Sequence, residues 1–417
     1  MSRKSWVKFL ALVVAIALVV ITYPNLPLLK APTTAVTIKL SGWAGNPLEQ
    51  QLLKQLLKEF ELQHPDIKVR YEVISDQYMD VITTRLIGEA APDVFYLESL
   101  EAPFFMIQNV LEPLNSYITP EFDLEDFEES LLDNFKYKDD IYGLPKDYST
   151  LALFYNKKAF AAAGLSSPPT TWDELRTYSE QLTGKLNRYG FGVTPQLSYQ
   201  AYKIAAFGGR VVDENGYAAF ASPEAVGGLQ LVVDQYQKDG SSAQATDVGT
   251  NSGTEMFGQN RVAMVIEGNW AIPYLETTFP QLEFATAEIP TINDKKGTMV
   301  FTVAYVMNKQ SQHKAAAWEL ISFLTGKEGM AQWTGTGFAL PTRTSVAARL
   351  GYDQDPLRSP LVAGIDYATS WQLGQYPAAI SNNFDNQFIS ALLGQQPLSS
   401  AMLRAQNAAN TQIRSRQ

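Results

Sequence analysis

The chain has 417 residues, more than a single hydrophobic core usually supports, so we expect two domains. It contains no cysteine and only two histidines, which excludes disulfides, thiol catalysis and cysteine-bound zinc and leaves little for histidine-based metal or triad chemistry. The formal net charge of −10 argues against nucleic acid and anionic membrane surfaces as partners.

The N-terminus combines basic residues with an apolar run. Arg3, Lys4 and Lys8 precede or flank an uncharged segment that runs to residue 21, and this pattern is typical of a secretory signal. We therefore expect export. No clean cleavage site follows, and no charge appears until Lys30, so residues 9–29 are just long enough to span a bilayer. Residues 1–35 are therefore either a signal peptide or an uncleaved anchor with a spacer.

The next part of the chain alternates between strand and helix patterns. Short β-rich or alternating runs flank segments in which apolar residues recur every three or four positions. The predicted order is strand 36–40, helix 48–60, strand 67–74, helix 78–87 and strand 93–97. Such a β-α-β-α-β order predicts a parallel sheet covered by helices.

The pattern changes at 139–155 and becomes richer in helices after it. Helices are predicted at 157–163, 172–182, 222–238, 254–257, 313–324, 384–393 and 398–413. Buried strands are predicted at 262–266 and 300–307.

A series of short segments has a distinctive order and spacing. They are 91–95, 142–145, 153–158, 163–165, 168–175, 258–264, 268–270, 316–320 and 341–343. Together they resemble the extracytoplasmic solute-binding proteins of ABC sugar importers, the maltose-binding-like family, over about 36–417. Many members of that family are lipoproteins, whereas this chain has no cysteine to carry a lipid. The resemblance thus implies a periplasmic protein that is free or tethered to the inner membrane by its N-terminal segment.

The resemblance implies an α/β fold, namely a two-lobed periplasmic-binding-protein fold with discontinuous lobes, hinge crossovers and a ligand cleft between the lobes. The implied boundaries are 36–146 and 300–343 for lobe 1, and 147–299 and 344–417 for lobe 2. The implied crossings lie near 145–147, 299–301 and 341–344.

Cleft residues are expected where strands end and where the chain crosses between lobes, because ligands of open α/β sheets gather at the carboxyl ends of strands. A sugar requires hydrogen-bonding groups for its hydroxyls and flat rings for its C–H faces. The candidates are Trp43, Asn46, Glu49, Tyr78, Glu98, Asp147, Tyr148, Ser149, Gly268, Trp270, Arg343 and Trp371. Structural roles compete for several of them: a helix-dipole acid for Glu49, a core ring for Trp270 and an ion pair for Arg343.

The sequence predicts the sugar-binding component of an ABC importer, with no enzymatic activity, no catalytic residue, no metal and no cofactor. The expected partners are a small sugar or glycoside and the permease subunits with their ATPase, and a monomer is expected. Three alternatives stay open: a binder of another solute such as a polyamine, metal chelate or anion; a carbohydrate-active enzyme; and a tethered sensor ectodomain. Two carboxylates at the separation that glycoside hydrolysis needs would favour the enzyme.

Overall fold

The computed structural model describes residues 35–43, 47–184 and 188–416. The strands of this part of the chain are β1 (Val36–Gly42), β2 (Ile67–Val73), β3 (Val94–Glu98), β4 (Lys136–Tyr137), β5 (Asp140–Ile141), β6 (Gly143–Asn156), β7 (Tyr189–Val193), β8 (Ser242–Gln244), β9 (Val262–Gly268), β10 (Phe284–Ala287), β11 (Thr298–Met307) and β12 (Ala368–Ser370).

The helices follow the same chain order. They are α2 (Pro47–Gln63), α3 (Tyr78–Ile87), α4 (Ala102–Ile107), α5 (Glu129–Leu132), α6 (Lys157–Ala163), α7 (Trp172–Leu182), α8 (Ala201–Ala206), α9 (Pro223–Gln237), α10 (Gly253–Gly258), α11 (Ala271–Thr278), α12 (Lys314–Thr325), α13 (Lys327–Thr334), α14 (Thr344–Leu350), α15 (Ser359–Ala363), α16 (Pro377–Leu392) and α17 (Leu398–Arg414). None of the helices in the described ranges is both long and apolar enough to cross a membrane.

Most predicted elements occur where the apolar pattern places them. Helices α3, α6 and α7 have the predicted bounds, and each of the strands β1, β3 and β9 is within two residues of its prediction at both ends. Helix α16 begins at Pro377, seven residues before the predicted start, because a proline fits the first turn of a helix, where its missing N–H is not needed.

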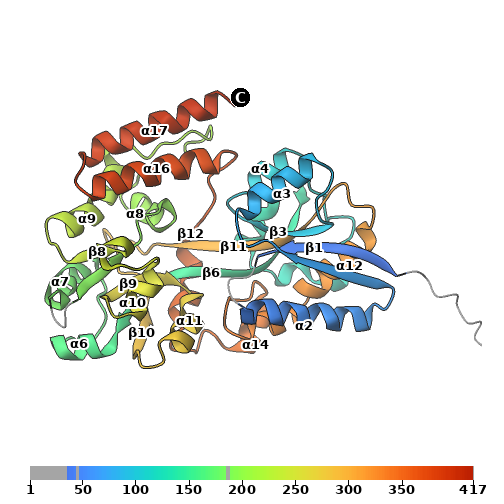
Figure 1. Cartoon of the computed structure of the whole chain (residues 1–417), viewed down its shortest axis with the longest axis horizontal. Helices are drawn as coiled ribbons and strands as arrows, with labels where there is room; N and C mark the ends of the chain where they lie inside the picture. Colours follow the sequence, from blue (N-terminus) through green and yellow to red (C-terminus); the bar gives the residue numbers. More distant parts are fainter. Residues whose placement is uncertain (1–34, 44–46, 185–187, 417) are drawn as a thin grey trace, which may run out of the picture.

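Ten of the described strands form a continuous sheet that runs through the molecule (Figure 1), and β4 and β5 form a separate two-stranded sheet. The order along the large sheet is β2-β1-β3-β11-β6-β9-β7-β8. Strands β1, β2 and β3 are parallel, as are β7, β8 and β9, and the two groups are joined by the antiparallel pair β6 and β11. The carboxyl ends of β3 and β9 consequently point toward the same central region from opposite sides.

Strands β6 and β11 each belong to both halves. The first part of β6 pairs with β11 and its second part pairs with β9, while β11 pairs with both β3 and β6. In Figure 1 the two strands run horizontally through the middle, with β1 and α12 on one side and β9 and α7 on the other. A third segment crosses at the same level, where Tyr148 and Leu340 exchange backbone hydrogen bonds of 3.0 and 2.9 Å.

Buried apolar side chains gather in separate cores on the two sides of these crossings. The first core contains residues from 38–144 and 304–346, and the second contains residues from 151–299 and 371–413. A smaller third core lies at the crossings and includes Tyr148, Val300 and Leu340. The apolar residues thus form two separately packed bodies, and the crossing strands connect them.

Candidate functional site

A cavity of about 780 Å³ lies between the two sides, at the level of the crossing strands. It is lined by Trp43, Glu49, Glu98, Lys146, Asp147, Tyr148, Ser149, Thr194, Gln196, Tyr199, Asn251, Ser252, Gly253, Thr254, Glu267, Trp270, Tyr274, Phe301, Val303, Trp333, Phe338 and Ala339. The lining comes from both halves of the chain and from both crossing strands. Aromatic rings and carboxylates dominate it, which is a composition suited to a polar ligand with flat faces.

The side formed by β1 and β3 supplies Trp43 directly after β1 and Glu98 at the end of β3. The Trp43 ring is held edge-on against Tyr78 and Tyr96, with ring centroids 4.9 and 5.1 Å apart. The hydroxyl of Tyr78 donates to the carbonyl of Ser41 and accepts from the backbone N–H of Tyr96, both at 3.0 Å. Tyr78 therefore lies behind Trp43 and fixes its position, and it does not line the cavity.

Strand β6 contributes two charged side chains in succession. Its register against β11 shifts between Asp147, opposite Val303, and Pro145, opposite Ala304, so Lys146 is an extra residue. Side chains of a regular strand alternate between its faces, and a bulge breaks that alternation. Here it allows Lys146 and Asp147 to form a buried ion pair with each other.

Aromatic side chains complete the surroundings of this ion pair. The indole nitrogen of Trp333 donates to Oδ2 of Asp147 at 2.6 Å. The ammonium group of Lys146 lies 4.4 Å from the ring centroid of Trp333 and 4.8 Å from that of Tyr96. Cation–π contacts and the adjacent carboxylate thus stabilise the buried charge of Lys146.

The side formed by β7 and β9 carries a buried carboxylate at the end of β9. Oε2 of Glu267 accepts from the indole nitrogen of Trp270 at 3.0 Å and from the hydroxyl of Tyr199 at 3.3 Å. Burial raises the pKa of Glu267 to about 7, although hydrogen bonds from Trp270, Tyr199 and Thr254 favour its ionised form. No basic side chain among the described residues pairs with it, since its hydrogen-bond donors are neutral.

Trp270 stands at the start of α11 with 39% of its surface exposed, which excludes a core position. Its ring meets Phe301 edge-on at a centroid distance of 5.8 Å. Gly268 is the residue that makes room for it, because a Cβ at this position would overlap the six-membered ring of Trp270. Gly268 therefore acts through Trp270 and does not itself line the cavity.

Other predicted residues also line the cavity. Glu49 is in the first turn of α2, and Tyr148 and Ser149 follow Asp147 in β6. The hydroxyl of Ser149 donates to the carbonyl of Thr150 and accepts from the N–H of Asn269, each at 2.8 Å. Asn46 was also predicted to bind ligand, and it lies outside the described residues.

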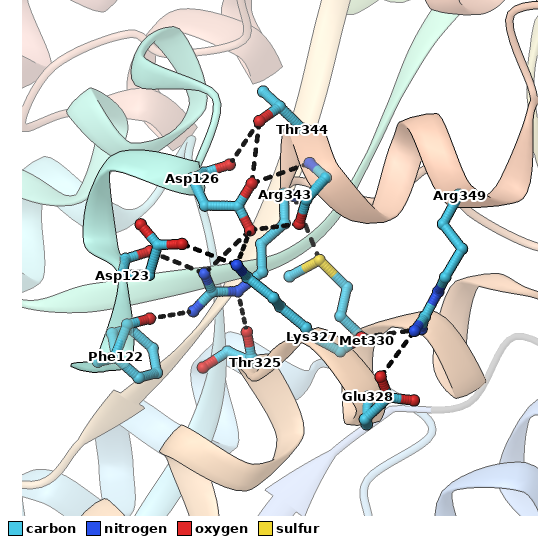
Figure 2. Close-up of polar contacts among 11 residues, drawn as sticks. Phe122, Asp123, Asp126, Thr325, Lys327, Glu328, Met330, Arg343, Thr344 and Arg349 are labelled. Carbon is cyan, nitrogen blue, oxygen red and sulfur yellow. Dashed lines mark hydrogen bonds and ion pairs between the residues drawn. The ribbon is translucent and has the colours of Figure 1, made fainter.

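Arg343 does not reach the cavity, contrary to its prediction. Figure 2 shows its guanidinium group enclosed by backbone carbonyls and by Asp126. It donates to the carbonyl oxygens of Thr325, Asp123 and Phe122 at 2.7, 2.8 and 3.0 Å and to Oδ2 of Asp126 at 3.3 Å. With 1% of its surface exposed, Arg343 is a structural residue that fixes segment 119–128 to α12.

Trp371 is also outside the cavity lining. Its ring is buried, and its centroid lies 6.4 Å from that of Phe301. Phe301 lines the cavity, so Trp371 stands behind it in a second layer. Trp371 supports the aromatic wall and cannot be a direct contact in this conformation.

Several lining residues were not predicted from the sequence. Those of chemical interest are Lys146, Thr194, Gln196, Tyr199, Thr254, Glu267, Tyr274, Phe301 and Trp333. Glu267 immediately precedes the Gly-Asn-Trp segment that contains the candidates Gly268 and Trp270. Its place at the end of a predicted strand is therefore a sequence signal that could have identified it. Among the residues described, no group of three or more acidic or histidine side chains is arranged to hold a metal ion.

The chain was compared with known proteins. The model of the family described as bacterial extracellular solute-binding protein matches residues 44–331. The arabinooligosaccharide-binding protein of Bacillus subtilis is 26% identical over 319 residues, which are 72% of this chain and 72% of that protein.

Two solved structures are similar to the whole described fold. An ABC substrate-binding protein from Listeria monocytogenes in complex with cycloalternan has a TM-score of 0.82 and 23% identity, and the match covers 91% of this chain and 99% of that one. A solute-binding protein of Thermotoga lettingae bound with α-D-tagatose has a TM-score of 0.79 and 26% identity, with 90% and 99% covered. These likenesses confirm the α/β, two-lobed architecture that was expected.

Proposed function

The chain belongs to the bacterial extracellular solute-binding protein family, and we propose that it is the component of an ABC importer that captures a sugar or glycoside between its lobes. The observation that carries this proposal is the cavity of about 780 Å³ whose walls come from both sides of the crossing strands. The names of its relatives support a carbohydrate, since they bind arabinooligosaccharide, cycloalternan and tagatose.

The chemistry of the lining supports the same ligand class. Trp43 and Trp270 come from opposite lobes and offer ring faces for the C–H patches of a sugar. Glu98, Asp147 and Glu267 offer oxygens that accept hydrogen bonds from hydroxyl groups. A buried polar group left unpaired by the wrong ligand costs about 1–3 kcal/mol, so such a lining also discriminates between ligands.

The proposed mechanism is closure of the two lobes around the ligand. A sugar that touches both walls binds the closed state more tightly than the open one and shifts the population toward it. A shift from 1:99 to 99:1 requires about 5.5 kcal/mol of differential binding. Hydrogen bonds to charged groups contribute about 1.5–3 kcal/mol each, so roughly two to four contacts made only on closure are sufficient.

We assign the lobes as predicted, with one change. Lobe 1 consists of 36–146 and 300–350, and lobe 2 consists of 147–299 and 351–417. Helix α14 joins lobe 1 because Val346 is buried in the first core. The bulge at Lys146 and the crossing at Leu340 then lie in the hinge, next to the cavity.

The further partners and the location follow from the same proposal. The closed form would dock on permease subunits whose ATPase drives import. The protein would act as a monomer in the periplasm, without a lipid anchor, and its segment 1–35 would serve as a signal or a tether. It would have no enzymatic activity and would release its sugar unchanged.

A thermal-shift screen against neutral mono-, di- and oligosaccharides tests the function. A ligand at 100 times its dissociation constant stabilises the folded chain by about 2.7 kcal/mol, which a melting curve resolves. Chromatography of the incubated sugar then tests for turnover. Stabilisation with unchanged sugar supports a binding protein, whereas cleavage products would support a carbohydrate-active enzyme.

A further inference from the structure

The charged groups that line the cavity are unequal in sign. Among the described residues that line it, four are carboxylates, namely Glu49, Glu98, Asp147 and Glu267, and one is a cation, Lys146. Lys146 is already paired with Asp147 and packed between two rings, so its positive charge is offset by groups of the protein itself. No arginine is among the lining residues in the part of the chain that the structure describes. A ligand entering this cavity therefore meets a surplus of negative charge.

Glu98 is the carboxylate with the least compensation. It ends β3, faces the cavity and receives no side-chain hydrogen bond or ion pair from any residue in the described ranges. Burial raises its pKa, and no cation counteracts that effect. Glu101 is a second acidic residue nearby, and burial, followed by the charges of Glu98 and Asp80, raises its pKa to about 7. The acidic character of this wall thus extends to residues outside the cavity lining.

Glu267 gives the opposite wall the same sign. Its partners Trp270 and Tyr199 are neutral donors. Helix α10 begins at this wall, and a helix start would ordinarily attract an anion. The carboxylate of Glu267 already lies beside that helix start, because a Cβ on Gly253 would overlap its Oε1 and the side chain of Thr254 forms a hydrogen bond with it. Among the described residues that line this wall, no side chain offers a cation to an anionic ligand.

Proteins that bind phosphates or carboxylates supply arginine, lysine or unpaired backbone N–H groups for them. An anionic sugar closed into this cavity would instead be placed between Glu98 and Glu267. Like charges brought together away from water strongly disfavour binding and act as a device of specificity. A basic amine has the opposite outcome, since carboxylates and the ring faces of Trp43 and Trp270 both attract cations.

We propose, building on the proposed function, that the cleft selects its sugar by charge: it accepts neutral and amine-bearing glycosides and rejects those that carry a carboxylate or phosphate. Glu98 is the main specificity-determining residue. This inference narrows the substrate class of the site, because uronic acids, sugar phosphates and other acidic glycosides are excluded.

Matched sugar sets test the proposal by isothermal titration calorimetry at pH 7.5. The probes are glucose, glucosamine, glucuronate and glucose 6-phosphate, the corresponding galactose series, and cellobiose with its amine-bearing and uronic acid analogues. In each set that binds, the acidic form should bind roughly 30-fold more weakly than the neutral form or not at all, and the amine at least as tightly as the neutral form.

The variant Glu98→Gln keeps the size and the hydrogen-bonding oxygen but removes the charge. It should reduce the neutral-to-acidic affinity ratio about fivefold or more, whereas Glu180→Gln, on the exposed face of α7, should leave the ratio unchanged. A melting curve confirms that each variant is folded. Two results would overturn this inference but leave the proposed function standing. One is that acidic forms bind within threefold of the affinity of neutral forms, and the other is that Glu98→Gln leaves the neutral-to-acidic affinity ratio unchanged. If no sugar in any set binds, the proposed function fails with it.

Discussion

The indole nitrogen of Trp270 donates a 3.0 Å hydrogen bond to Glu267, which is three residues earlier in the chain. Glu267 lies within a fully buried strand, and Trp270 stands at the exposed start of the next helix. The bond therefore connects the floor of the cavity to its aromatic wall. Because Gly268 leaves space beneath the ring, Trp270 is held against the wall in one orientation before any ligand arrives.

Replacement of Trp270 should affect ligand binding more than folding. We expect Trp270→Ala to weaken sugar binding at least about tenfold, because a stacking plate is lost. The melting temperature should change little, since 39% of the side chain is already exposed. Calorimetry and thermal melting measure the two effects. A large fall in melting temperature with the affinity retained would show that the ring serves the core.

The raised pKa of Glu267 predicts a pH-dependent stability. Its pKa is about 7 in the folded chain, against 4.5 for an ordinary glutamate, so between these pH values the folded state holds a proton that the unfolded state has lost. The contribution of Glu267 to stability is therefore fully present below about pH 4.5 and is lost as the pH rises through about 7.

Glu267→Gln should remove this dependence. Relative to wild type, the variant should gain up to about 3 kcal/mol of unfolding free energy between pH 5 and pH 8, an upper limit set by the size of the pKa shift. Denaturant unfolding at the two pH values measures the difference. Equal differences at pH 5 and pH 8 would show that the carboxyl group has an ordinary pKa.

Arg343 should be important for folding and not for ligand recognition. Arg343→Met removes the cation buried beside Asp126 and leaves only the half-exposed ammonium group of Lys327, 3.8 Å away, to offset that carboxylate. Breaking a buried pair in this way typically costs about 3–5 kcal/mol. The exposed pair of Arg349 with Glu328 is a matched control, and Arg349→Met should cost less than about 1 kcal/mol. Sugar affinity per folded molecule should be unchanged in both variants. A loss of affinity in Arg343→Met alone would show that Arg343 contacts the ligand.

Lys146 should support the cavity through Asp147. In Lys146→Met the side chain still packs between the rings of Tyr96 and Trp333, but Asp147 loses its buried partner. We expect a destabilisation of about 3 kcal/mol or more, measured by denaturant unfolding. The double variant Lys146→Met with Asp147→Asn should recover most of it. No recovery would mean that the ammonium group matters through its ring contacts.

Local patterns predicted many of the elements, and two residues that line the cavity, for physical reasons. Amphipathic periodicity in α3 and α7 is strong, so their bounds were predictable. Trp43 and Glu98 follow strands directly, and the carboxyl ends of strands form binding sites in sheets of this class. These local signals require no knowledge of distant contacts.

The residues that were missed or misplaced depend on distant contacts. Glu267 lies within a strand whose seven residues are all buried, so its surroundings resemble a core. Arg343 pairs with Asp126 across 217 positions, which no local pattern reveals. Trp333 lines the cavity and donates to Asp147, 186 positions away, and no local pattern reveals that contact. The layers behind the cavity wall, such as Trp371 behind Phe301, are equally products of the tertiary fold.

Small-angle X-ray scattering with and without a bound sugar tests the central claim most directly. If one sugar is held between both lobes, saturation should reduce the radius of gyration, and the Trp43→Ala and Trp270→Ala variants should each need more sugar for the same contraction. Stoichiometric sugar binding with an unchanged radius of gyration would contradict capture by closure.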